Sequence, residues 1–251
     1  MSKTVLVLGG GYGGILTAKS LAKKVKKSKQ SDVKIVLIDQ NPFHTMLTEL
    51  HEVAAGRVPE QSIRMDFKEI LAGRKIDFVK DRITGINFEK KTLAGEKESY
   101  TYDYLVLGTG SRPTFYNTPG VSEHAFTLWS YDDAVRLRGH IRDMFQRAYT
   151  ETDAQRRREL LTFVVAGAGF TGVEMAGELA EYVPVLCGEF HTDPDEVGIW
   201  LVDLIERIIP SIPEKQGRRA ARRLEKMGVK IRMKTGVCGL EADGPTLRCT
   251  D

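Results

Sequence analysis

Two glycine-rich turns constrain this chain more than any other feature, because they recur in the same setting. Each has the spacing G-x-G-x-x-G, with glycines at Gly9, Gly11 and Gly14 in the first copy and at Gly167, Gly169 and Gly172 in the second. In this pattern the first glycine permits a tight turn, the second lets the backbone approach a pyrophosphate, and the third lets the next helix pack close to the strand. The copies lie a domain's length apart, so two related units are expected.

Each turn stands between an apolar run and a segment with helical periodicity. TVLVL and LTFVVAG are typical of buried parallel strands, and the returning strands VKIVLID and GIWLVD close on Asp39 and Asp203. This order is that of a mononucleotide-binding unit, whose helix N-terminus faces phosphates and whose closing acid faces a ribose. The glycines could instead serve strand and helix packing alone, with each Asp an ordinary cap or surface acid. Two complete copies favour nucleotide binding.

The residue after the second closing acid bears on cofactor choice. Leu204, rather than a basic residue, follows Asp203. This favours a free ribose 2′-hydroxyl and hence NAD over NADP, although Arg207 lies nearby.

The composition excludes several other classes of protein. Lys and Arg outnumber Asp and Glu by only 37 to 34, a balance that does not favour nucleic acid as a partner. The three cysteines form no C-x-x-C pair, which indicates a reducing compartment with the cytoplasm as the default. No apolar run is long enough to span a membrane.

Three enzyme signatures fail at particular positions. The first turn has the glycine separation of a P-loop, but Ile15 and Leu16 stand where Lys and Ser or Thr are required. The segment at His51 begins like a zinc-protease helix, but Ala55 replaces the second histidine, so no metal site is expected. A G-x-S-x-G nucleophile turn is absent. His44 and His51 could touch a ligand, although a lone histidine is more often structural.

The remaining pattern predicts an α/β fold with two Rossmann-like dinucleotide-binding domains. Hairpins are expected over DFVKDRITGINFEKKTL and KESYTYDYLVLGTG, and one long amphipathic helix from Thr127 to about Arg158. A helix from Gly172 to about Tyr182 should lead into a surface loop, VPVLCGEFHTDPDE. A helix over EKQGRRAARRLEKMG and a strand from VKIRMKTGV follow. Loop residues in SRPTFYNTP place the boundary between domains 1–115 and 116–251.

Several segments resemble a known family. The two turns, YDYLVLGTGSRP and GFTGVEMAGELAEY resemble the flavin-dependent pyridine-nucleotide oxidoreductases, which carry two Rossmann-like domains of the three-layer β/β/α type. FHTMLTELHEVAAG and IERIIPSIPEKQGRRAARRLEKMGVKI are most similar to the type II NADH dehydrogenases within that superfamily. These enzymes pass electrons from NADH through FAD to a quinone.

The resemblance implies roles for particular residues. The first turn would hold FAD, with Asp39 on the adenosine ribose and Thr109 and Gly110 beside the flavin. The second turn would hold NADH, with Asp203 on its ribose. Glu174 matches the family glutamate that lies close to the nicotinamide, although a first-turn acid also suits the helix dipole. Hydride would pass from the nicotinamide to the flavin.

The positions of the cysteines limit which electron acceptors are possible. Disulfide reductases of this superfamily carry C-x4-C, and related reductases a single Cys, on the helix after the first unit, whereas NPFHTMLTELHEVAAG has none. A thiol relay is therefore not expected, and the acceptor would be a quinone or a small redox carrier or soluble oxidant.

The resemblance also sets expectations for the end of the chain and for assembly. The chain stops at TGVCGLEADGPTLRCTD, within what should be the small sheet of the NAD domain. The family's late flavin motif and its quinone and membrane-anchoring segments would lie beyond, so a C-terminally truncated chain is expected, which could bind FAD weakly or not at all. A nucleotide-binding fragment without catalytic turnover is the alternative. The complete protein would be cytoplasmic or peripheral on the cytoplasmic face of the membrane, and a homodimer is one assembly that the resemblance allows.

Overall fold

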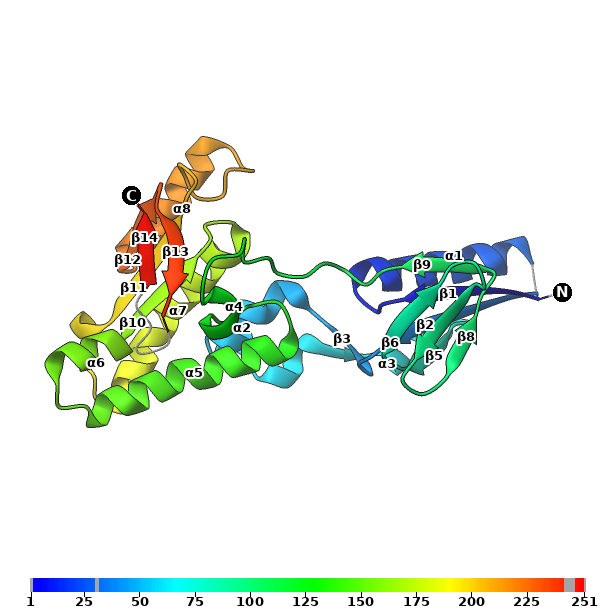
Figure 1. Ribbon diagram of the computed structural model, residues 1–251, viewed down its shortest axis with the longest axis horizontal. Helices are drawn as coiled ribbons and strands as arrows, with labels where there is room; N and C mark the ends of the chain where they lie inside the picture. Colours follow the sequence, from blue (N-terminus) through cyan, green and yellow to red (C-terminus); the bar gives the residue numbers. More distant parts are fainter. Residues whose placement is uncertain (1, 30–31, 242–246, 251) are drawn as a thin grey trace. The chain divides into compact units, whose positions relative to one another are not determined.

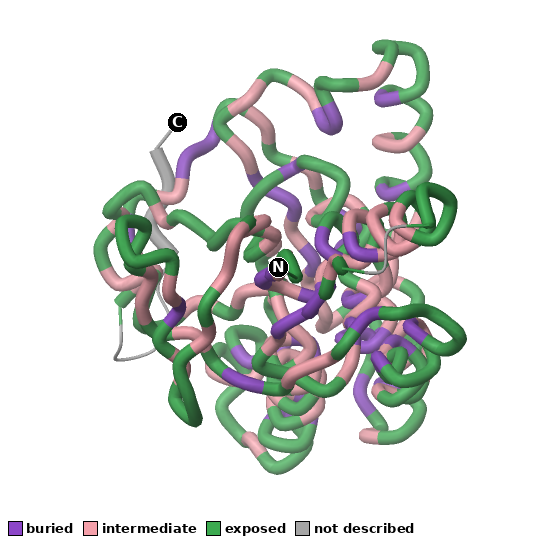
Figure 2. Tube along the Cα trace, turned by 90° about the vertical axis from the view of Figure 1, so that its right-hand side faces the viewer, coloured by how far each residue is buried: buried purple, intermediate pink, exposed green. Residues whose placement is uncertain are grey.

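The chain divides by its contacts into two compact units. The structure is a computed structural model that describes residues 2–29, 32–241 and 247–250. One unit comprises Met1–Met46 with Arg64–Arg112, and the other comprises Leu47–Ile63 with Pro113–Asp251. Figure 2 shows that the buried stretches of the trace are short and alternate with exposed turns.

The first unit is built on a four-stranded parallel sheet in the order β5-β2-β1-β9 (Figure 1). Its strands are β1 (Lys3–Leu8), β2 (Val33–Asp39), β5 (Asp77–Lys80) and β9 (Tyr104–Leu107). Apolar residues occupy both faces of β1 and β2, because alternate side chains of a strand point to opposite sides and each side is covered.

The two faces of this sheet have separate cores. On one face, Val7, Ile35 and Leu37 pack with Ala18 of α1 (Tyr12–Ser28) and with Phe67 of α3 (Phe67–Leu71). On the other face, the alternate residues of the same strands pack against the antiparallel sheet formed by β6 (Ile83–Asn87), β7 (Thr92–Gly95) and β8 (Ser99–Thr101). The unit therefore has three layers. A short ladder of β3 (Phe43–Thr45) and β4 (Arg64–Asp66) completes it.

The second unit repeats the parallel arrangement with three strands in the order β10-β11-β12. Its principal elements are β10 (Thr162–Ala166), α7 (Phe170–Phe190), β11 (Gly198–Asp203), α8 (Glu214–Lys226) and β12 (Val229–Met233). The antiparallel pair β13 (Gly236–Leu240) and β14 (Leu247–Thr250) follows. The other helices are α2 (Leu50–Ala54), α4 (Val121–His124), α5 (Tyr131–Thr150) and α6 (Ala154–Leu160), with short 3-10 turns η1 (Leu47–Glu49), η2 (Glu60–Ile63) and η3 (Pro194–Glu196).

One segment packs outside its place in the sequence. Leu47–Ile63 lies between two parts of the first unit in the chain, yet its helix α2 packs against α5 and α7 of the second unit. A division at residue 115 assigns this segment to the first domain, so the division by contacts differs there.

Two sequence-based expectations about helices are wrong. The single helix expected from Thr127 to about Arg158 is two helices, because hydrogen-bonded caps fix their starts. Ser130 forms a capping box that begins α5, and the Asp153 carboxylate accepts the Arg156 N–H at 2.7 Å to begin α6.

The loop expected over VPVLCGEFHTDPDE is also wrong over most of its length. Helix α7 continues to Phe190 with Pro184 inside it, although proline removes one backbone hydrogen bond. The buried residues Leu179, Val183 and Leu186 keep helical spacing across the proline, so burial of this face offsets the lost bond. The hairpin interpretation of DFVK is wrong as well, since β5 joins the parallel sheet.

We expect Phe145→Ala to destabilise the second unit strongly. The ring is fully buried on α5 and lies 5.9 Å from the ring of Phe163 and 6.2 Å from that of Phe190, measured between centroids. Its loss should lower the free energy of unfolding by about 3–5 kcal/mol. Urea unfolding checks this, with Tyr149→Ala as the control. Tyr149 is 52% exposed on the same helix, so its change should stay within about 0.5 kcal/mol. Equal losses for the two variants would contradict the packing described here.

Candidate functional site: two dinucleotide turns and the first turn of α7

The two glycine turns have the same backbone geometry. Gly9 has φ +100° and Gly167 has φ +107°, values that L side chains rarely adopt. The N–H of Gly9 donates to the Ile38 carbonyl at 2.8 Å, and the N–H of Gly167 donates to the Val202 carbonyl at 2.9 Å. In each unit the turn is therefore bonded to the strand that closes on the acid.

The third glycines are required by packing. A Cβ at Gly14 would overlap the carbonyl oxygen of Gly9, and a Cβ at Gly172 would overlap that of Gly167. Only a residue without a side chain lets the helix begin this close to the turn.

The second glycines face open space. Gly11 and Gly169 are the N-caps of α1 and α7, with φ −73° in both, and no described atom lies within 4 Å of a Cβ built on either. Neither cap residue offers a side-chain hydrogen bond to its helix. A helix leaves its first N–H groups without intrahelical partners, so an anion can approach them here.

The closing acids are bonded to the middle residue of each turn. Asp39 accepts the N–H of Gly10 at 2.6 Å, and Asp203 accepts the N–H of Ala168 at 2.6 Å. The other oxygen of each carboxylate accepts the N–H two residues further along, at 2.8 and 3.3 Å. A carboxylate has about four acceptor positions, so each acid can still receive a ribose hydroxyl.

The carbonyl of the same middle residue is held from elsewhere in the chain. In the first unit, the buried imidazole of His44 donates from Nδ1 to the Gly10 carbonyl at 3.0 Å. In the second unit, the main-chain N–H of Ile209 donates to the Ala168 carbonyl at 2.8 Å. Ile209 is buried at φ +43°, a strained conformation for a β-branched residue. We call these two contacts the rear bonds of the turns. His44 thus has a structural partner, while nothing in the sequence pattern pointed to Ile209.

Thr109 and Gly110 lie beside the first turn. They follow Gly108, the first residue after β9. The N–H of Gly108 donates to the Leu8 carbonyl at 2.7 Å, and the carbonyl of Gly108 leaves no space for a Cβ on Gly9. Thr109 and Gly110 are both exposed. This part of the first unit therefore joins the ends of two neighbouring parallel strands to the glycine turn.

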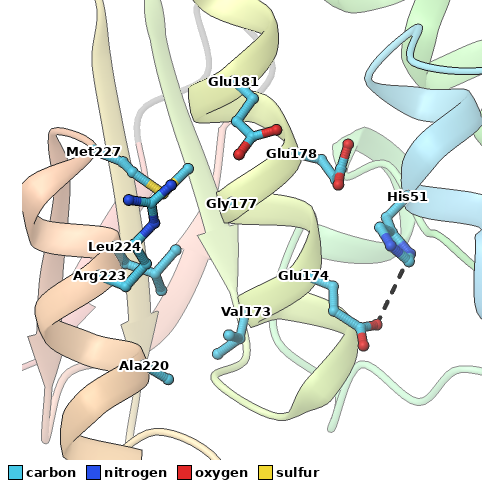
Figure 3. Close-up of a pocket in the computed structure, with 10 residues that line it drawn as sticks. All are labelled: His51, Val173, Glu174, Gly177, Glu178, Glu181, Ala220, Arg223, Leu224 and Met227. Atoms are coloured by element: carbon cyan, nitrogen blue, oxygen red, sulfur yellow. Dashed lines mark ion pairs between the residues drawn. The ribbon is translucent and has the colours of Figure 1, made fainter.

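Glu174 lies near the start of α7 and points toward α2 (Figure 3). Its Oε2 lies 3.8 Å from Nδ1 of His51. A pocket of about 270 Å³ lies between α7 and α8, with Glu174 and His51 on one side and Leu224 and Met227 on the other. Glu174 is half exposed, so its carboxylate is available to a ligand.

The cysteines whose side chains the structure describes do not suit a thiol relay. Cys187 is buried in α7, and burial raises the pKa of its thiol, which favours the unreactive protonated form. Cys238 is exposed on β13. Neither lies near a glycine turn in the sequence.

Comparison with known proteins decides the family. The sequence profile of the pyridine nucleotide-disulphide oxidoreductases matches residues 3–251. The chain belongs to this family. The match confirms the expected α/β fold with two Rossmann-like domains, and the three layers of the first unit agree with it.

The curated relatives of this family member include quinone-reducing enzymes. A type II NADH:quinone oxidoreductase of Mycobacterium tuberculosis is 34% identical over 98% of this chain, and one of Staphylococcus aureus is 31% identical over 96%. The chain spans 53% and 59% of the lengths of those proteins. The resemblance drawn from the sequence motifs is therefore confirmed.

Solved structures show the same fold. NDH2 from Plasmodium falciparum, in complex with NADH, superposes with a TM-score of 0.86 at 18% identity, over 96% of this chain and 50% of that one. The reductase in a covalent putidaredoxin reductase–putidaredoxin complex superposes with a TM-score of 0.68 at 21% identity, over 98% and 54%.

We expect alanine to destabilise the second unit at one glycine of its turn and to leave stability almost unchanged at another. Gly172→Ala should destabilise the second unit by about 1–3 kcal/mol, because its methyl group would overlap the Gly167 carbonyl. Gly169→Ala should change stability by less than about 0.5 kcal/mol, because its methyl group meets open space at an ordinary φ. Urea unfolding followed by tryptophan fluorescence measures both. A Gly172→Ala protein as stable as the parent would show that the close approach is not required.

Proposed function

We propose that this chain is the dinucleotide-binding part of an FAD-dependent NADH:quinone oxidoreductase. The observation that carries the proposal is that the same cradle, a glycine turn with its closing acid, occurs twice. In each cradle the second glycine of the turn leaves room for a pyrophosphate, and the closing acid keeps free acceptor positions. Membership of the family and the names of the curated relatives agree with it.

In this proposal the first unit, within residues 1–115, binds FAD. The N-terminus of α1 would face the pyrophosphate across Gly11, and Asp39 would accept hydroxyls of the adenosine ribose. Thr109 and Gly110, at the end of β9, would lie beside the flavin. Gly9 and Gly14 would act by shaping the turn.

The second unit, within residues 116–251, would bind NADH in the same manner. Asp203 would accept the adenosine ribose hydroxyls, and Gly169 would admit the pyrophosphate. Leu204 is 68% exposed, and the Arg207 guanidinium donates to the carbonyls of Pro210 and Ile212 at 2.7–3.1 Å. Because Arg207 is bonded within its own loop, this arrangement supports NADH rather than NADPH.

The chemistry would come from the cofactors and the orientation from the protein. FAD held by the first unit would supply two-electron redox chemistry between NADH and a quinone, with the second proton of the quinol taken from solvent. Glu174 would orient the nicotinamide by hydrogen bonding to its carboxamide, and such orientation governs how often the reacting atoms come within reach.

In this proposal the quinone acceptor determines where in the cell the complete protein would work. Membrane quinones dissolve in the bilayer, so the complete protein would work at the cytoplasmic face of a membrane. Within residues 2–29, 32–241 and 247–250, no helix is both long and apolar enough to cross one. We also propose that the protein forms a homodimer, which light scattering of the purified protein would test.

We expect the complete protein, purified with FAD, to show flavin absorption that bleaches on anaerobic addition of NADH and returns on addition of a soluble quinone. Gly169→Ala should retain the flavin bands but bleach only at higher NADH concentration, because its methyl group would stand where the pyrophosphate approaches. A coloured protein that NADH leaves unbleached would contradict hydride transfer. Reoxidation by a small iron–sulfur protein and not by quinone would contradict the acceptor.

We expect Glu174→Gln to slow flavin reduction by roughly 10- to 100-fold with little change in NADH affinity, because orientation would suffer more than binding. Stopped-flow reduction at several NADH concentrations separates the limiting rate from the dissociation constant. Glu225→Gln, an exposed carboxylate on α8, is the control. An unchanged limiting rate would remove Glu174 from the mechanism.

A further inference from the structure

One face of α7 receives the segment that contains α2. Glu174, Glu178 and Tyr182 follow one another at intervals of four residues, which places them on one side of a helix. Each of them contacts a residue between His51 and Arg57. We call these three residues the α7 stripe.

Two contacts of the stripe fix the position of the segment. Arg57 forms an ion pair with Glu178, whose side chain is only 12% exposed. Gly56, at φ +68°, lies under the Tyr182 ring, where a Cβ would be 2.8 Å from Cζ. Neither of these two contacts involves His51. The position of His51 opposite Glu174 therefore does not depend on an attraction between their side chains.

The third contact joins a carboxylate to an imidazole, which carries a positive charge only when it is protonated. His51 is 14% exposed and Glu174 is 48% exposed, with 3.8 Å between Nδ1 and Oε2. Among the described residues, His51 is the basic group that pairs with Glu174, and Figure 3 shows the two side chains pointing toward one another.

The other charged groups around His51 already have partners or lie further along the helices. Glu178 is paired with Arg57, which also lies 4.0 Å from Glu52 on α2. Glu181 and Arg223 line the far part of the pocket. On α5, which also packs against α2, Arg142 pairs with Glu189 and contacts the Tyr182 hydroxyl.

We propose that His51 is a positioning residue for Glu174: the protonated imidazole holds the carboxylate on the α2 side of α7. The proposal rests on the role given to Glu174 in the proposed function. Loss of the proton or of the imidazole would free the carboxylate to rotate. His51 would then tune how well Glu174 orients a nicotinamide without touching the nucleotide.

A double-mutant cycle tests the pair without any cofactor. His51→Gln, Glu174→Gln and the double variant are unfolded in urea, and tryptophan fluorescence is followed. Both tryptophans, Trp129 and Trp200, lie in the second unit, so the signal follows the unit that contains the pair. The effects should be non-additive by about two- to five-fold in the unfolding equilibrium constant at about pH 5.5 and additive at about pH 8.5, because an imidazole attracts a carboxylate only when it carries a proton.

Arg57→Gln provides the matched control. It removes one of the two docking contacts and keeps that of Gly56 with Tyr182, so its coupling with Glu174→Gln should be weaker than that of His51→Gln and should not change between the two pH values. Additivity of His51→Gln with Glu174→Gln at the lower pH would overturn the proposal, as would equal coupling at both. His51→Asn replaces His51→Gln if that variant gives no cooperative transition.

The rate of flavin reduction by NADH tests whether His51 affects function. In the protein loaded with FAD, His51→Gln should slow the limiting rate with NADH and leave the NADH dissociation constant unchanged, whereas Arg57→Gln, which keeps the second docking contact, should slow it less. Equal slowing by the two variants would mean that His51 acts through docking alone and would overturn the positioning role. A parent protein that NADH does not reduce would refute the proposed function, while the unfolding cycle would still decide whether the pair forms.

Discussion

Each glycine turn depends on one hydrogen bond, from the N–H of its middle residue to the closing acid. At 2.6 Å in both units, this bond ties the end of the second strand to the turn and hence to the start of the helix. A bond to a carboxylate is stronger than one between neutral groups, so the turn is held before any ligand arrives. In the proposed function Asp39 and Asp203 would carry two roles, so removing either would change the turn as well as the proposed contact with a ribose. The same bond in both units makes the two cradles equivalent.

The sequence predicted the features that local pattern encodes. β2 and β11 begin and end at the expected residues, because a short apolar run that closes on an acid leaves few alternatives. The rear bonds could not be predicted, since His44 and Ile209 reach their turns from far along the chain and a main-chain donor leaves no side-chain signature. The helix expected from residue 127 to 158 was wrong because a capping aspartate can serve a helix end as readily as a helix surface.

The segment 47–63 shows why the surroundings of Glu174 also escaped the sequence. Chain order associates this segment with the first glycine turn, but it packs against α5 and α7, and its contacts with α7 include three residues spaced along that helix. A glutamate four residues before another is common on helices, so the spacing alone says nothing about what docks there. His51 could be considered only as a lone histidine until the packing of α2 placed it opposite a carboxylate. The glycine that passes beneath Tyr182 belongs to the same arrangement.

The two rear bonds differ in how they tolerate sequence change. In the second unit the donor is a main-chain N–H, which every residue except proline carries, so side chains at position 209 can vary as long as the loop keeps its path. In the first unit the donor is a ring nitrogen, and few other side chains have the length and the donor to reach the same carbonyl. Over many generations of substitution, the first turn would therefore lose its rear support through a single codon, whereas the second would lose it only through a change in the course of the backbone.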